Sequence, residues 1–141
     1  MKIIISILLL LPLFSFSQTT FNKYEIAEFI RKGAKVTIGD EFNKYEVQEL
    51  ILINPSLVTV IPNKFNKYEV AEFVQNGAKI IIGDQFNKYE VQELILMNPS
   101  LVTVIPNKFN KYEVAEFIQK GAKIIIGNQY SKYVVSEFLN N

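Results

Sequence analysis

Phe-Asn-Lys-Tyr-Glu-Val, at residues 42–47, is the stretch that decides the fold, because the chain repeats it. Successive copies are separated alternately by 21 and 23 residues. Self-similarity with a period of this size indicates an array built from one repeated unit. The other copies, some of them altered, begin at Phe21, Phe65, Phe86, Phe109 and Tyr130.

The repeat contains two kinds of unit, which alternate along the chain. Type A units span residues 21–41, 65–85 and 109–129, and type B units span residues 42–64 and 86–108. The two type B units differ only where Ile53 is replaced by Met97. One unit of each type makes a double repeat of 44 residues. The last segment, 130–141, departs from the consensus and is expected to be a C-terminal cap.

Each unit is expected to begin with a helix. In the first unit, Asn22 is in the position of an N-cap and Glu25 follows three residues later, as in a capping box. Phe21 and Ile26 flank this turn in the positions of a hydrophobic staple. Apolar residues then recur at the i, i+3, i+4 spacing that is typical of one buried helix face.

The two unit types end their helices differently. Type A units have a glycine, first at Gly33, where a left-handed residue closes a helix. Type B units reach Asn-Pro at 54–55 and 98–99, and proline prevents the helix from continuing. A short run rich in Val, Ile and Thr follows each helix and predicts a strand. These strands are expected at residues 35–38, 57–61, 79–82, 101–105 and 123–126.

One helix and one strand in every unit, joined by short connections, predict parallel strands linked by right-handed crossovers. Repetition of this step predicts a single-domain α/β solenoid over residues 18–141, with a parallel sheet on one side and helices on the other. The layout resembles that of leucine-rich repeats, which have nearly the same period. Their Leu-x-x-Leu-x-Leu-x-x-Asn signature is absent, so the resemblance is one of layout only.

The two faces of the expected sheet differ, because side chains alternate along a strand. Counting back from the Phe of the next unit predicts that one face lies beneath the helices and the other is open. The face beneath the helices would carry Ala34, Val36 and Ile38 in type A, and Leu57, Thr59 and Ile61 in type B. The open face would carry Lys35, Thr37, Val58, Val60, Lys79, Ile81, Val102, Val104, Lys123 and Ile125.

The expected open face is the first candidate site. Its valines and isoleucines would form an apolar band bordered by lysines, and such a band suggests a protein partner or a second copy of the chain. The alternative is that a bulge shifts the strand by one residue and buries the valines. The residues predicted to bind a partner are Val58, Val60, Lys79, Ile81, Val102, Val104, Lys123 and Ile125.

A tyrosine at the second position of each helix is the second candidate site. Tyr24 lies about 200° around the helix from Ile26, at about 100° per residue, so it points away from the core. Stacked units would place these rings in a row that can bind a sugar or a surface polymer. The alternative is that the rings seal the helix ends by packing between units. The row comprises Tyr24, Tyr45, Tyr68, Tyr89, Tyr112 and Tyr133.

Composition excludes several kinds of chemistry. Fifteen Lys and Arg residues nearly balance 14 Asp and Glu, so the chain has no basic character suited to nucleic acid. It contains neither Cys nor His, which removes thiolate nucleophiles, disulfides and the usual transition-metal ligands. Asp40 and Asp84 correspond to Asn128 in the third type A unit, so no loop carboxylate is present in every copy. We predict a protein that is not an enzyme and needs no cofactor or metal.

Residues 1–17 predict a secretory signal peptide. Lys2 precedes an apolar run, and small residues at Ser15 and Ser17 suit cleavage before Gln18. The run is shorter than the roughly 20 apolar residues that span a bilayer, so we expect no membrane anchor. The expected location is therefore outside the cytoplasm: periplasmic, cell-surface or extracellular.

Overall fold

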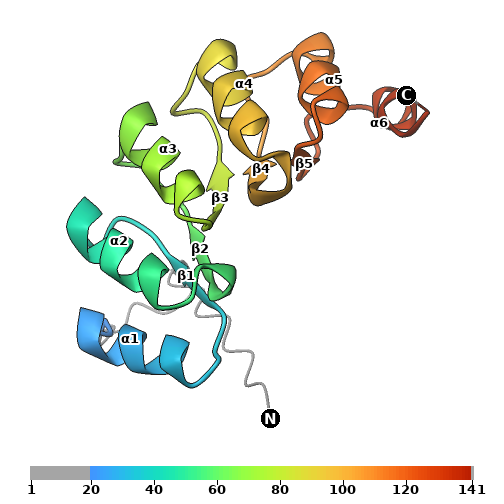
Figure 1. Ribbon diagram of the computed structural model, residues 1–141. Coiled ribbons are helices and arrows are strands. Elements are labelled where there is room, and N and C mark those ends of the chain that lie inside the picture. The colour runs from blue at the N-terminus through green and yellow to red at the C-terminus, as the bar shows by residue number, and fades with distance from the viewer. Residues whose placement is uncertain (1–19, 141) are drawn as a thin grey trace.

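The computed structural model describes residues 20–140, which form an α/β fold with one parallel sheet and six helices (Figure 1). The predicted signal peptide, residues 1–17, lies outside the described residues. The helices are α1 (Lys23–Arg31), α2 (Lys44–Ile53), α3 (Lys67–Gln75), α4 (Lys88–Met97), α5 (Lys111–Gln119) and α6 (Lys132–Leu139). The strands are β1 (Val36–Ile38), β2 (Val58–Val60), β3 (Lys79–Ile82), β4 (Val102–Val104) and β5 (Lys123–Ile124).

The predicted capping boxes are confirmed in α1, α2, α3 and α4. At α1, the Asn22 side chain accepts a hydrogen bond from the backbone N–H of Glu25 at 3.0 Å, and the Glu25 carboxylate accepts one from the Asn22 N–H at 3.4 Å. The box is incomplete at α5, where Glu113 accepts from the Asn110 side chain instead. Ser131 caps α6 alone. The repeated phrase therefore fixes where each helix begins.

The helix ends also follow the sequence. The glycines that close the type A helices have positive φ angles of 90°, 93° and 96°, a conformation that only glycine adopts readily. In type B units, Pro55 and Pro99 begin short 3₁₀ turns, η1 (Pro55–Leu57) and η2 (Pro99–Leu101), which lead directly into β2 and β4. These turns take Leu57 and Leu101 out of the strands in which they were predicted.

The five strands lie in chain order and all neighbouring pairs are parallel. Their register is staggered. Ile38 lies opposite Val60, but Val60 lies opposite Ile80, although the residue equivalent to Ile38 in the second type A unit is Ile82. Each double repeat thus shifts the strand by two residues, which corresponds to about 6–7 Å along its direction.

The helices lie along the outer side of an arc and the strands along its inner side (Figure 1). This curvature follows from the packing distances of the two layers. Parallel strands pair about 4.8 Å apart, whereas neighbouring helices need about 8–10 Å between their axes. The layer of helices is therefore longer than the sheet to which it is attached, and the two layers curve with the helices on the outside.

The core lies between the helices and the sheet. Phe42, Phe65, Phe86 and Phe109 are buried, as the staple predicts. Phe21 is the exception, because 37% of its surface is exposed. It packs edge-to-face on Phe29, with 5.1 Å between the ring centroids.

The predicted sheet faces are wrong for the type B strands. Val58, Val60, Val102 and Val104 were expected on the open face, but each is fully buried beneath the helices. Thr59 and Ile61, which were expected beneath the helices, are partly exposed instead.

Loop length explains this reversal. Three residues, 39–41, separate the last buried residue of β1 from the next Phe, but four residues, 61–64, follow Val60. Counting back from the Phe therefore assigns the faces correctly in type A units and inverts them in type B units.

Candidate functional site

The six tyrosines of the predicted row are exposed large side chains that the repeat places at the same position in every helix. Between 65% and 74% of each residue is exposed. Every tyrosine is the second residue of its helix, and consecutive helices lie side by side in chain order (Figure 1). Their rings therefore follow one end of the helical layer. They do not pack between units, which was the alternative. We call Tyr24, Tyr45, Tyr68, Tyr89, Tyr112 and Tyr133 the tyrosine row.

A lysine accompanies every ring of the tyrosine row. The Nζ atom of the preceding residue, as in Lys23 and Tyr24, lies 4.9–5.2 Å from the ring centroid in all six helices. Contacts of this length are cation–π interactions and stabilise exposed sites by about 0.5–1 kcal/mol each. The lysine lies near one face of each ring, which leaves the rest of an exposed aromatic surface for a ligand.

The lysines of the type A helices are also paired with carboxylates. Lys23 Nζ lies 2.6 Å from Glu49 Oε2 on the next helix, and Lys67 makes the same contact with Glu93 at 2.6 Å. Lys111 and Glu137 are 3.5 Å apart. The hydrogen bond that each lysine donates to its glutamate raises the pKa of Lys23 and of Lys67 above the ordinary value. These pairs join each type A helix to the helix that follows it.

The lysines of the type B helices are placed differently. Gln48 donates a hydrogen bond to Glu72 on the next helix, and Gln92 donates to Glu116 at 2.6 Å. Within residues 20–140, no ion pair forms at Lys44, Lys88 or Lys132. This alternation was not predicted from the sequence. The sequence feature that could have indicated it is the glutamine at positions 48 and 92, where the type A helices have alanine.

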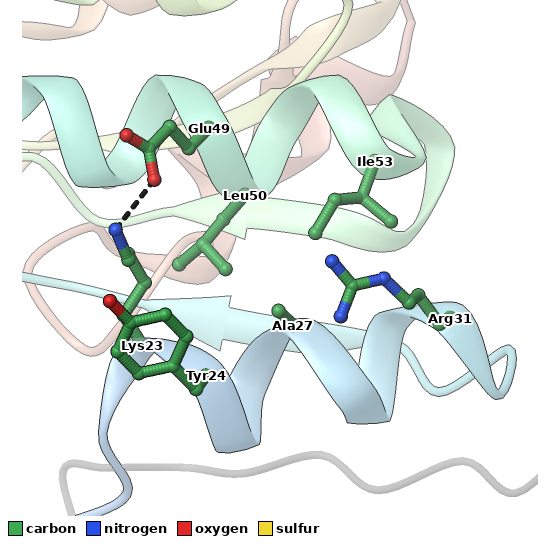
Figure 2. A pocket seen from close by; sticks show the side chains of 7 residues that line it. All are labelled: Lys23, Tyr24, Ala27, Arg31, Glu49, Leu50 and Ile53. Carbon is green, nitrogen blue, oxygen red and sulfur yellow. Dashed lines mark hydrogen bonds and ion pairs between the residues drawn. The ribbon is translucent and has the colours of Figure 1, made fainter.

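A shallow pocket of about 160 Å³ lies beside the first member of the row, between α1 and α2. Figure 2 shows Lys23 and Glu49 joined at one end, Arg31 and Ile53 facing each other at the other end, and Leu50 between the two ends. Sites for drug-sized molecules are typically about 300–1,000 Å³. The pocket is therefore a notch that one substituent of a larger ligand would fill.

The open face of the sheet carries only part of the predicted partner-binding set. Lys79 and Lys123 are exposed, Ile81 is partly exposed and 49% of Ile125 is exposed. Lys79 lies opposite Thr59, and Ile81 lies opposite Thr103. The buried Val58, Val60, Val102 and Val104 are out of reach of a partner. Thr59 and Thr103 lie on the open face where these valines were predicted, so the face is more polar than predicted.

The loop carboxylates have structural partners. Asp40 accepts a hydrogen bond from the Lys64 backbone N–H at 3.1 Å, and its carbonyl oxygen accepts from Lys64 Nζ at 2.6 Å. Asp84 and Lys108 repeat this contact. Each aspartate thus ties the loop after a type A strand to the loop after the next type B strand.

Tyr130 occupies the position of Phe in the other units, and its hydroxyl makes hydrogen bonds that Phe cannot make. It donates to the Phe109 carbonyl oxygen at 2.6 Å and lies 3.1 Å from that of Pro106. Burial raises the pKa of Tyr130 above the ordinary value for tyrosine. The altered phrase therefore anchors α6 to the preceding loop.

Residues 20–140 bring together no cluster of three or more carboxylates that would hold a metal ion. In the same range, no helix has both the length and the apolar character needed to cross a membrane.

Comparison with known protein families, curated proteins and solved structures finds no match to this chain. Its function is therefore argued from its own geometry.

Proposed function

We propose that the chain is a secreted, non-enzymatic α/β solenoid that binds an extended carbohydrate polymer along the tyrosine row. The solenoid interpretation is supported by the strict chain order of the parallel strands and by the arc of the helices (Figure 1). Flat, exposed rings at regular intervals suit a linear polymer, because each ring offers an apolar face and a hydroxyl. Several weak contacts along one ligand then add up to useful affinity.

The observation that carries this proposal is the retention of Lys-Tyr in every unit. In α6 the cap residue has become Ser131 and the third-position Glu has become Val134, but Lys132 and Tyr133 remain. The caps and staples explain Phe, Asn, Glu and Val of the repeated phrase. They leave Tyr with no structural contact other than the weak cation–π contact of the preceding lysine, and nearly three quarters of Tyr24 is exposed. A ligand explains why the tyrosine persists.

The triple substitution Y45A/Y68A/Y89A is expected to weaken polysaccharide binding by about 100-fold, because each aromatic contact contributes roughly 1 kcal/mol. Binding would be measured by affinity electrophoresis in gels that contain a soluble polysaccharide. Y45F/Y68F/Y89F keeps the rings and should retain most of the affinity. Q75A/Q119A, on the same helix faces seven residues after a tyrosine, is the control. A wild-type protein that no polysaccharide retards would refute the proposal.

A second candidate function is self-association through the open face of the sheet. It is supported by Ile81 and Ile125, apolar side chains that remain accessible on that face, and by the lysines Lys79 and Lys123 that border them. An exposed apolar band on a sheet is a common site for a second copy of a chain.

The double substitution I81K/I125K is expected to convert a dimer into a monomer, because it places like charges where two copies would meet. The measurement is the solution mass by multi-angle light scattering. Q75A/Q119A should keep the dimer mass. A wild-type chain with the mass of a monomer at all concentrations would rule out self-association.

A further inference from the structure

The pairing of the lysines alternates along the tyrosine row with the period of the double repeat. In type A helices the lysine beside the ring is neutralised by a glutamate of the next helix, as in the pair of Lys23 with Glu49. In type B helices the corresponding glutamate belongs to the following type A helix and is held by glutamine, as Glu72 is held by Gln48. Lys44 therefore keeps an uncompensated positive charge beside an exposed ring.

We infer that the tyrosine row recognises a sparsely charged acidic polysaccharide, in which single carboxylate-bearing sugars are separated by neutral ones. This inference rests on the proposed function and specifies its ligand. Neighbouring helices lie about 8–10 Å apart, so the uncompensated lysines recur about every 16–20 Å along the row. The anionic groups of a matching polymer recur at a similar interval, with neutral sugars over the intervening tyrosines.

The surroundings of the row disfavour the other two charge patterns. A polymer with a carboxylate on every sugar would bring negative charge against Glu72 and Glu116, which are exposed and whose charge the neutral Gln48 and Gln92 do not compensate. Like charges in a contact are repulsive. A neutral polymer would leave Lys44 and Lys88 without a partner while it covers them, and covering an unpaired charge costs free energy. A polymer with one carboxylate per double repeat pairs with the lysines and places neutral sugars against the glutamates.

The charge balance of the whole chain agrees with this specificity. Fifteen basic and 14 acidic residues give a formal net charge of +1. A chain so close to neutrality has no long-range attraction for polyanions in general. Selection of an acidic polymer must therefore come from the local placement of the unpaired lysines.

The test compares three polymers and two matched variants by affinity electrophoresis. Gellan carries one glucuronate in each repeating unit, polygalacturonate is acidic at every sugar, and dextran is neutral. K44Q/K88Q removes unpaired lysines beside the row, whereas K79Q/K123Q removes two exposed lysines of the open sheet face and changes the net charge equally. We expect gellan to be preferred. K44Q/K88Q should bind gellan about fourfold more weakly, from two exposed charge contacts each worth about a factor of two, and K79Q/K123Q should match the wild type within twofold.

The outcomes separate this inference from the function on which it rests. Preference for polygalacturonate or dextran, or unchanged gellan binding by K44Q/K88Q, would overturn the charge pattern. If Y45A/Y68A/Y89A loses binding in those cases, the carbohydrate function still holds. A loss of gellan binding with rising salt in the wild type but not in K44Q/K88Q would support the inference, since salt screens exposed charges. Failure of the wild type to bind any of the polymers would overturn both proposals.

Discussion

Replacing Val60 by Lys is expected to abolish cooperative folding, whereas replacing the adjacent Ile61 by Lys is expected to leave the protein folded. Val60 is fully buried in β2 and lies opposite Ile38 and Ile80 in the neighbouring strands. An unpaired ammonium at this position costs several kcal/mol. Since small proteins are stable by only about 5–15 kcal/mol, this loss consumes most of the free energy of unfolding.

Ile61 tests the same change on the other face of the sheet. Its side chain is partly exposed, so a lysine there can extend into water. The measurement is urea denaturation followed by circular dichroism, with an expected loss of less than about 1 kcal/mol for Ile61→Lys. The sheet faces predicted from the sequence give the opposite expectation, in which Ile61→Lys unfolds the protein and Val60→Lys does not. A folded Val60→Lys protein together with an unfolded Ile61→Lys protein would show that the sheet faces are as first predicted.

Local structure was predictable because its causes are local. The capping boxes, the left-handed glycines and the Asn-Pro stops involve residues within one turn of each other. Each of these signals is repeated in several units, so an error in one would have been exposed by another. The helices were therefore located from the sequence to within a residue or two, and the strands nearly as well.

The sheet faces could not be predicted with the same ease. A strand has a period of two, so one additional loop residue moves its whole set of side chains to the other face. The loop after Val60 contains four residues, 61–64, whereas the loop after Ile38 contains three. Apolar composition did not reveal the difference, because the type B strands carry apolar residues on both faces. The stagger of the strands was also unpredictable, since it depends on pairing between units.

The candidate site was partly predictable. The exposure of Tyr24 and its equivalents follows from the angle between that position and the buried face of the helix. The pairing of the lysines depends on contacts between neighbouring helices. Gln48 differs from the alanine of type A helices, but only the structure shows that it captures Glu72. The alternation of charge therefore appears only when the units are stacked.

Replacing Phe73 by Ala is expected to lower the free energy of unfolding by about 3–5 kcal/mol, the usual cost of removing a fully buried phenylalanine. Phe73 is 0% exposed and packs edge-to-face on Phe65, with 5.1 Å between centroids. Its removal leaves a cavity between α3 and the sheet. The cavity also weakens the contacts of α3 with its neighbours α2 and α4.

Phe29 is the matched control, because it holds the equivalent position in the first unit and packs on Phe21 at the same 5.1 Å. The ring pair is thus the same, worth about 0.5–1.5 kcal/mol beyond burial in either unit. Phe29 is only partly buried, so Phe29→Ala should cost about 1–2 kcal/mol, less than full burial of such a side chain is worth. Phe117, also 0% exposed, should behave as Phe73 does. Urea denaturation of the three variants measures these losses. Equal losses at Phe29 and Phe73 would mean that stability depends on the ring pair within a unit, and that stacking between units contributes little.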